Sequence, residues 1–398
     1  MRSSPTEPPA STPDRQPMPV WCGLTCGNWL RLLRRRPTIE PAYWKRFLAV
    51  TAASGFNSLL AAAETICFGR RIRRTEIPSA PIFIIGHWRS GTTLLQEFLA
   101  LDDQFVTPNL FQCSFPDHFL VSERWLKPLT GWMQPRTRLM DAMLSSWNAP
   151  AEEEIALLLM TLSSPYLVAA FPDAPRELHR FDNLSKSLTP EERTAWKSAC
   201  VRFLKKLTFK SGRTLLLKSP ANTARIPLLL ELFPDARFIH IVRDPLAVFS
   251  STRHLHRVLS RNNSFTSAEP IDLDERILSS YQSMYQSYHL YRVKIPADRR
   301  VELRFEDLER DPAGELKKIY DHLQLPGWDR LEAKLEEPLA RHRAFRKNAF
   351  DLPEELRRRI IERWEPAFLR YHYPVEVPSS PPSEPVSDQA SSARPSPQ

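Results

Sequence analysis

Cysteine is scarce in this sequence. The 398 residues contain five cysteines, which are too few and too scattered for the disulfide framework of a small secreted domain. Cys22 and Cys26 are close together, but no matching second pair completes a structural zinc site. The start of the chain also lacks the pattern of a secretory signal peptide. We therefore expect a reducing, cytoplasmic location and no metal ion.

Internal repeats and the signatures of zinc fingers, homeodomains and RNP motifs are absent as well. We therefore expect no nucleic-acid partner, although the formal net charge is +9. A basic protein of this kind suits a polyanionic cofactor, an acidic acceptor or a membrane surface. The length and the 42% content of hydrophobic residues are sufficient for one large α/β domain.

A lysine is missing from the loop that otherwise looks most like a phosphate cradle. The apolar run Ile82–Ile85 predicts a strand buried on both faces of a parallel sheet. Gly86 and Gly91 then bracket four residues, as in the first half of the P-loop pattern G-x-x-x-x-G-K-[ST]. Thr92 occupies the lysine position, and Thr93 occupies the hydroxyl position. The loop therefore differs from the P-loop of a nucleoside triphosphatase.

The strongest cation in this loop is Arg89, which precedes the second glycine. Backbone N–H groups at a helix start and a planar guanidinium together form a strong anion site. The loop thus predicts a site for a phosphate or sulfate group that does not need the lysine and Mg²⁺ arrangement of a P-loop nucleoside triphosphatase.

A second segment, Arg213–Thr252, contains two further strand-helix units. Arg243 ends the second of these strands, and Ser251 lies about two turns into the helix that follows. Both side chains can then face one ligand at the carboxyl ends of the strands. The predicted sheet is all parallel and flanked by helices, and it consists of Ile82–Ile85, Thr214–Leu217, Phe238–Val242 and Val301–Phe305.

Three motifs together resemble the sulfotransferase superfamily, which uses 3′-phosphoadenosine 5′-phosphosulfate (PAPS) as sulfuryl donor. They are the loop HWRSGTTLLQ, the lysine of LLLKSP and the segment VRDPLAVFSS. The chain is more similar to the bacterial branch related to carbohydrate and tyrosylprotein sulfotransferases than to the cytosolic small-molecule branch. The resemblance implies a three-layer α/β fold with a P-loop-like cradle. It also implies transfer to a hydroxyl acceptor, leaving adenosine 3′,5′-bisphosphate.

The resemblance also implies roles for single residues. Arg243 and Ser251 match the pair that holds the 3′-phosphate, and Lys218 matches the lysine that contacts the transferring sulfuryl group. Arg346 lies in a basic segment, RHRAFRK, that either folds over the 3′-phosphate or is a solvated loop. The residues that match the 5′-phosphosulfate loop are Arg89, Ser90, Gly91, Thr92 and Thr93.

No residue matches the family's catalytic bases. Pro220 stands where the cytosolic branch has a histidine, and Thr107–Phe115 contains no carboxylate. The remaining candidates are Glu152, Glu153 and Glu154 at a predicted helix N-terminus, where negative charge is favoured in any case. Because the apolar run after them should bury one carboxylate and raise its pKa, we rank Glu153 and Glu154 above Glu152. His87 in the loop is the next candidate.

We expect four parts in the chain: a disordered tail over 1–20, a helical segment over 21–77, the sulfotransferase domain over 78–374 and a Pro/Ser-rich disordered tail over 375–398. The apolar stretch Phe47–Phe68 predicts helices packed on the core. Flanking arginines leave open a peripheral membrane contact through 47–74.

Two alternative functions also remain open at this point. One is a nucleotide phosphotransferase with Asp244 as a metal-binding carboxylate, and the other is a noncatalytic nucleotide-binding scaffold. The sequence identifies neither the acceptor nor the oligomeric state.

Overall fold

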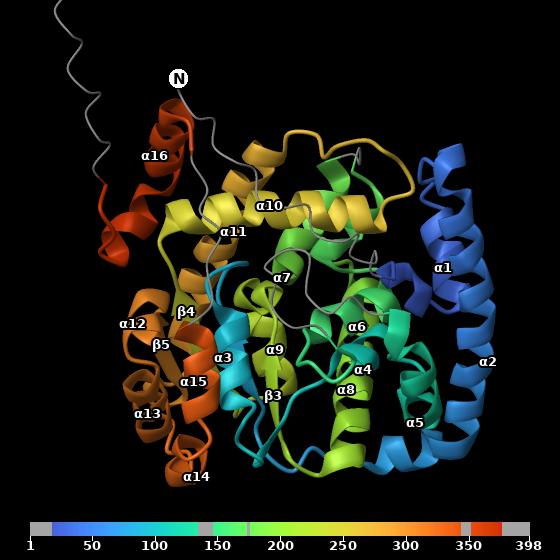
Figure 1. Ribbon diagram of the computed structural model, residues 1–398, viewed down its shortest axis with the longest axis horizontal. Helices are drawn as coiled ribbons and strands as arrows, with labels where there is room; N and C mark the ends of the chain where they lie inside the picture. The colour runs from blue at the N-terminus through green and yellow to red at the C-terminus, as the bar shows by residue number, and fades with distance from the viewer. Residues whose placement is uncertain (1–17, 134–145, 173–175, 344–351, 376–398) are drawn as a thin grey trace, which may run out of the picture.

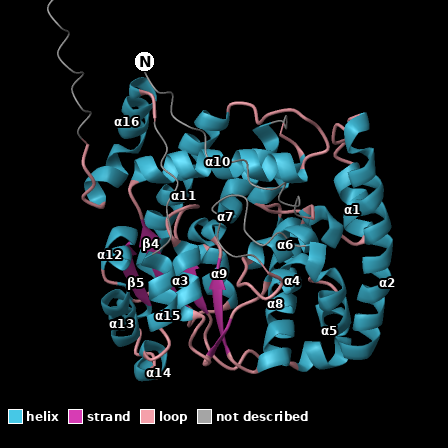
Figure 2. Ribbon diagram, in the orientation of Figure 1, coloured by secondary structure: helices cyan, strands magenta, loops and turns pink. Residues whose placement is uncertain are grey.

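A five-stranded parallel sheet forms the centre of the molecule (Figures 1 and 2). The computed structural model describes residues 18–133, 146–172, 176–343 and 352–375. The strand order is β2-β3-β1-β4-β5, and every neighbouring pair is parallel. The strands are β1 (Ile82–Ile85), β2 (Phe105–Val106), β3 (Thr214–Lys218), β4 (Arg237–Val242) and β5 (Arg300–Arg304). The four predicted strands are confirmed, whereas the short edge strand β2 was not predicted.

Helices cover both faces of this sheet. In chain order they are α1 (Cys26–Leu33), α2 (Trp44–Arg74), α3 (Thr92–Leu99), α4 (Leu110–Ser114), α5 (Phe119–Thr130), α6 (Glu153–Thr161), α7 (Leu184–Ser187), α8 (Pro190–Ser211), α9 (Ile226–Leu232), α10 (Pro245–Asn263), α11 (Leu273–Tyr291), α12 (Phe305–Arg310), α13 (Pro312–His322), α14 (Trp328–Glu332), α15 (Glu336–Arg343) and α16 (Glu354–Arg370). The short 3₁₀ helices used below are η1 (Val20–Gly23), η3 (Gly131–Met133), η4 (Pro165–Ala170) and η6 (Pro220–Ala224).

The alternation of side chains along the strands divides the core into two layers. Phe83 and Ile85 of β1 belong to a large cluster on one face, whereas Ile82 and Ile84 belong to a separate cluster on the other face. All four side chains are buried, as expected for a parallel strand covered on both sides. The fold is therefore the predicted three-layer α/β architecture.

The N-terminal segment forms a further helical layer, in which α2 runs along one edge of the molecule with α1 and α5 beside it (Figure 1). The predicted helices over 47–68 are one continuous helix, α2. The polar residues on its inner face bind the rest of the protein: Asn57 donates to the Cys22 carbonyl oxygen at 2.7 Å and to the Leu24 carbonyl oxygen at 3.0 Å. The predicted tails lie almost wholly outside the described residues, and the proposed domain boundaries stay predictions.

Candidate active site

The loop between β1 and α3 has a backbone that requires glycine at two positions. Gly86 has φ 151°, and a Cβ there would lie 2.4 Å from the Ile241 carbonyl oxygen. Gly91 has φ 97°, and a Cβ there would lie 2.3 Å from the Phe305 ring. Arg89 between them also has a positive φ, 69°, which is strained for a side chain of this kind. Such strain collects at ligand-binding loops, which supports the predicted cradle.

Hydrogen bonds from inside the loop and from η6 hold this backbone in place. The Ser90 hydroxyl donates to the His87 carbonyl oxygen at 2.7 Å. Thr223 of η6 accepts from the Gly86 N–H at 2.8 Å, and its hydroxyl lies 2.9 Å from the Gly86 carbonyl oxygen. The loop is therefore pre-formed before any ligand binds. Sequence reasoning missed Thr223, because a single threonine in a short connection carries no pattern.

Two arginines meet at the mouth of the loop. The Arg89 Nε donates to the Ser251 hydroxyl at 2.8 Å, and the Arg243 guanidinium donates to the Arg89 carbonyl oxygen at 3.1 Å. Arg243 also lies over the Phe305 ring, with its Cζ 4.4 Å from the ring centroid. Burial, together with the charge of Arg89, lowers the pKa of Arg243. Two neighbouring cations of this kind fit an anionic ligand.

The structure thus brings three of the predicted ligand residues together. Ser251, however, binds Arg89 directly rather than Arg243. Phe305 supports both Arg243 and the close approach of Gly91, a role that the sequence did not indicate. The predicted contribution of Arg346 lies outside the described residues.

Lys218 ends β3 beside the loop and takes part in an ordered network. Its ammonium lies 2.6 Å from a carboxylate oxygen of Glu152 and 3.2 Å from the Thr93 hydroxyl. The other oxygen of Glu152 accepts from the Tyr166 hydroxyl at 2.6 Å. That hydroxyl in turn accepts from the Trp88 indole N–H at 2.9 Å. The Glu152 carboxylate and the Lys218 ammonium are therefore in contact, next to the loop between β1 and α3.

The three glutamates at the start of α6 have different environments. Glu152 is the N-cap of α6, and 17% of its side chain is exposed. Glu153 is buried; it accepts from the Asn222 side-chain amide at 2.6 Å and from the Lys218 backbone N–H at 3.1 Å. Burial raises its pKa to about 7. Glu154 is fully buried and forms a two-pronged ion pair with the Arg225 guanidinium.

The three glutamates also differ in whether they contact the Lys218 ammonium. Both carboxylate oxygens of Glu154 are held by Arg225, away from the loop. Both oxygens of Glu153 accept from groups of β3 and η6, just as both oxygens of Glu152 bind Lys218 and Tyr166. Glu152 alone of the three contacts the Lys218 ammonium. The burial expected for Glu153 and Glu154 is observed, and their ranking as bases stays a prediction.

His87 is fully buried, and burial lowers its pKa to about 4. Its Nδ1 lies 3.0 Å from the Trp88 carbonyl oxygen. A buried imidazole with a lowered pKa is a weak base. The structure therefore does not favour His87 as the catalytic base.

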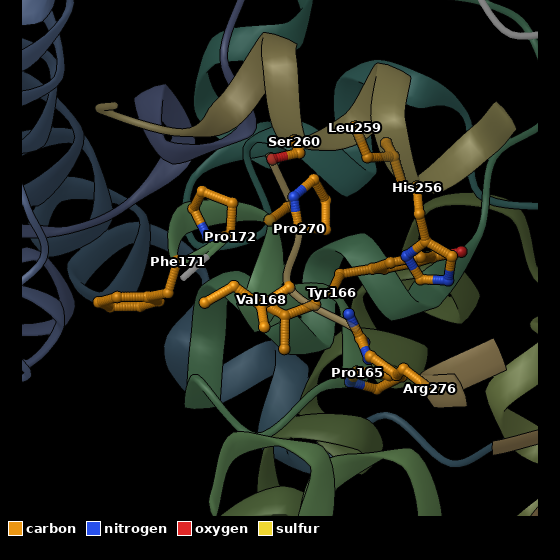
Figure 3. A pocket seen from close by; sticks show the side chains of 12 residues that line it. Pro165, Tyr166, Val168, Phe171, Pro172, His256, Leu259, Ser260, Pro270 and Arg276 are labelled. Carbon is orange, nitrogen blue, oxygen red and sulfur yellow. The ribbon is translucent and has the colours of Figure 1, made fainter. Parts of the chain in front are cut away.

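A small cavity adjoins this network on the side of η4 (Figure 3). Tyr166 contributes to its wall, together with side chains that are mostly apolar, including Val168, Leu259 and Ile271. Its volume of about 20 Å³ is enough for about one water molecule and too small for an acceptor. The wall also includes His256, Ser260 and Arg276, so the cavity has a mixed polar and apolar lining beside Tyr166.

Among the described residues, no group of three or more His, Cys, Asp or Glu side chains could hold a metal ion. The sulfuryl-transfer prediction does not depend on such a group.

Comparison with known proteins identifies similar chains. Residues 81–330 match the model of the "Sulfotransferase family". "Omega-hydroxy-beta-dihydromenaquinone-9 sulfotransferase Stf3" of Mycobacterium bovis is 38% identical over 361 residues, which is 90% of this chain and 92% of that protein. Human "Carbohydrate sulfotransferase 5" is 23% identical over 75% of each chain. The crystal structure of sulfotransferase STF9 from Mycobacterium avium has a TM-score of 0.67 at 18% identity, covering 86% of this chain and 89% of that one.

Proposed function

Because this chain belongs to the sulfotransferase family and is a sulfotransferase enzyme, we propose that it moves a sulfuryl group from PAPS to a lipid hydroxyl, with Glu152 as base. The observation that carries the assignment of Glu152 is its 2.6 Å contact with the Lys218 ammonium. Family membership favours this function over the phosphotransferase and scaffold alternatives.

The residues of the loop fit a phosphosulfate donor. The N–H groups at the start of α3 and the Arg89 side chain are the donors that a 5′-phosphosulfate requires. Arg243 is the residue that would bind the 3′-phosphate, and its stacking on Phe305 fixes the plane of the guanidinium. Gly86 and Gly91 let the Ile241 carbonyl oxygen and the Phe305 ring approach the loop backbone closely, and Arg89 with its positive φ belongs to the same turn.

When bound, PAPS supplies the sulfuryl group. The acceptor oxygen forms a bond to sulfur while the bond from sulfur to the bridging phosphate oxygen breaks. Glu152 takes the acceptor proton, and the Tyr166 hydroxyl and the Lys218 ammonium hold the two carboxylate oxygens in position. Lys218, beside Thr93, stabilises the negative charge that develops on the departing oxygen. No residue in this sequence of events needs a metal ion, so we expect activity in excess EDTA.

The lipid class of the acceptor is inferred from similarity. The name of the Mycobacterium bovis relative states that it acts on a hydroxylated menaquinone derivative, and the two chains match over nearly their whole lengths. We extend the proposal to a hydroxylated polyprenyl quinone, in preference to a sugar.

A water-insoluble acceptor would be met at a membrane, so we also propose that the enzyme works in the cytoplasm at a membrane surface. Its oligomeric state is left open.

The test is a kinetic comparison of Glu152→Gln with Glu153→Gln, using labelled PAPS and a panel of hydroxylated polyprenyl quinones, sugars and phenols with EDTA present. Glutamine keeps the shape of the side chain and removes its basicity. We expect Glu152→Gln to lower kcat about 10²- to 10⁴-fold with little change in the affinity for adenosine 3′,5′-bisphosphate.

Glu153→Gln is the matched control. It removes a neighbouring carboxylate that accepts from the Lys218 backbone N–H, whereas the Lys218 ammonium contacts Glu152. Turnover by Glu152→Gln close to that of the unmodified enzyme would refute the assignment of the base. Turnover of sugars and not of hydroxylated quinones would refute the acceptor class, and loss of activity in EDTA would refute a metal-independent transfer.

A further inference from the structure

The outward face of α2 carries an apolar stripe where a surface helix normally carries charge. Residues spaced by three or four along the helix share this face, and they include Trp44, Leu48, Leu59 and Ile66. Leu59 is 73% exposed and Ile66 is 84% exposed. The stripe from Trp44 to Ile66 is about 33 Å long at 1.5 Å per residue. Between Phe47 and Ala63 the helix contains no charged residue on any face.

Neighbouring elements extend the stripe into a broader surface. Trp125 of α5 is 40% exposed and contacts Phe56 of α2 edge to face, with ring centroids 6.3 Å apart. Leu129 of α5 and Trp132 of η3 are also exposed. We call the exposed side chains of this surface the α2/α5 face: Trp44, Leu48, Phe56, Leu59, Ile66, Trp125, Leu129 and Trp132. Figure 1 shows α2 and α5 on the same edge of the molecule.

The exposed charges on α2 and α5 have one sign. The last turn of α2 carries Arg71, Arg73 and Arg74, all exposed, directly after Arg70. Arg124 of α5 is exposed as well. The acidic residues of α2 and α5 are Glu64 and Glu123, and both are buried and paired with lysines. A basic rim around an apolar surface is complementary to anionic lipid headgroups above acyl chains.

The inner face of α2 excludes a spanning arrangement. By length and composition alone, the helix Pro41–Arg74 could cross a membrane. Its inner face, however, holds Glu64 in a buried ion pair with Lys206 and Asn57 in hydrogen bonds to η1 and to Leu24. Crossing a bilayer would break these contacts and place the groups in hydrocarbon. A helix that is fixed to the protein on one side can only lie in the plane of the interface.

We propose that the α2/α5 face docks on an anionic lipid bilayer, with α2 parallel to the membrane plane. Three tryptophans suit this position, since tryptophan is enriched at the boundary between headgroups and acyl chains. The other occupants of such a surface are a second copy of the chain and a partner protein. The uniformly basic rim favours lipid over a second copy, because two such rims would repel each other.

The experiment is flotation of the full-length protein with vesicles of phosphatidylcholine alone or mixed in equal parts with phosphatidylglycerol. We expect strong flotation with the mixed vesicles, weaker flotation with phosphatidylcholine, and a decrease as salt is raised. The double variant Leu59→Ser/Ile66→Ser should reduce the bound fraction at least several-fold. Arg71→Glu/Arg74→Glu should reduce binding to the mixed vesicles in particular.

The matched control is Val293→Ser/Leu369→Ser, which removes two exposed apolar side chains far from α2 along the chain. This control should float like the unmodified protein. Absence of flotation at low salt, or equal flotation of all variants, would overturn the proposal. A dimer in sedimentation velocity that Leu59→Ser/Ile66→Ser converts to monomer, without vesicle binding, would assign the face to a second copy instead. Flotation requires no turnover, so its outcome is separate from that of the proposed reaction.

Discussion

At the scale of single residues, Arg243 is the side chain whose surroundings are most specific for an anion. It is stacked on Phe305, linked to the Arg89 carbonyl oxygen, and held close to a second guanidinium. We expect Arg243→Ala to weaken binding of adenosine 3′,5′-bisphosphate by about 2–4 kcal/mol, the range for loss of a charged partner in a buried site. Titration calorimetry measures this directly.

The control for this substitution is Arg237→Ala, which removes an arginine from the opposite end of the same strand. It should leave nucleotide affinity unchanged. Arg243→Lys should fall between the two, because it keeps the charge and loses the planar stacking. Normal nucleotide binding by Arg243→Ala would show that the 3′-phosphate lies elsewhere.

Glu153 connects the site to the pH dependence of stability. Burial raises its pKa from 4.5 to about 7, so between these values the folded protein binds more protons than the unfolded chain. The contribution of this group to the free energy of unfolding is therefore largest below about pH 4.5. It falls as the pH rises through about 7, by about 3 kcal/mol at 1.36 kcal/mol per pKa unit.

Glu153→Gln removes this titration. Urea unfolding at a series of pH values should show that the unmodified protein loses stability relative to the variant as pH rises over this interval. Parallel pH profiles for the two proteins would contradict the raised pKa. Glu76→Gln, an exposed carboxylate, is the control for a general effect of removing a charge.

At the scale of elements, the N-terminus of α6 shows why the sequence indicates a group of candidate carboxylates but not the contacts of each one. Glu152 is the extended N-cap and Glu153 and Glu154 are in the first helical turn, so the three adjacent side chains face three different neighbours. Glu152 reaches Lys218, Glu153 reaches Asn222 and Glu154 reaches Arg225. The three glutamates and the apolar run that follows them are visible in the sequence. The direction of each glutamate side chain depends on the contacts that the start of α6 makes with β3 and η6.

The strand-loop-helix units were predictable because their signals are local. A buried apolar run and two glycines with required backbone angles specify β1 and the cradle with little help from distant parts of the chain. The contacts of Tyr166 and Thr223 were not predictable, since each joins positions far apart in the sequence without a recognisable motif. The edge strand β2 has two residues, too few for a periodic pattern.

The outward face of α2 has a similar explanation. Composition alone gave two readings of Phe47–Phe68, a packed helix and a membrane contact. The helix has both an inner polar face that is hydrogen-bonded to the protein and an outer apolar face. The observed packing and the proposed membrane contact concern opposite sides of one element, which the sequence could not separate without the bonds that orient the helix.

At the scale of the whole molecule, the N-terminal layer is connected to the α/β core by a buried ion pair. Glu64 of α2 pairs with Lys206 of α8, and both side chains are at most 4% exposed. Glu64 also accepts from the Leu120 N–H at 2.7 Å, and the Lys206 ammonium lies 4.3 Å from the Phe119 ring centroid. Burial raises the pKa of Glu64 and lowers that of Lys206, so each charge depends on the other. This arrangement makes the layer part of one folding unit.

We therefore expect Glu64→Gln to destabilise the entire protein by about 3–5 kcal/mol, because it leaves the Lys206 charge buried without its partner. Urea unfolding followed by both tryptophan fluorescence and circular dichroism should still show a single transition, shifted to lower urea. The double variant Glu64→Leu/Lys206→Met should recover most of the loss, since an apolar pair of similar volume needs no compensating charge. Two separate transitions in the unmodified protein, or a Glu64→Gln variant no less stable than Glu76→Gln, would show that residues 21–77 fold independently of the core.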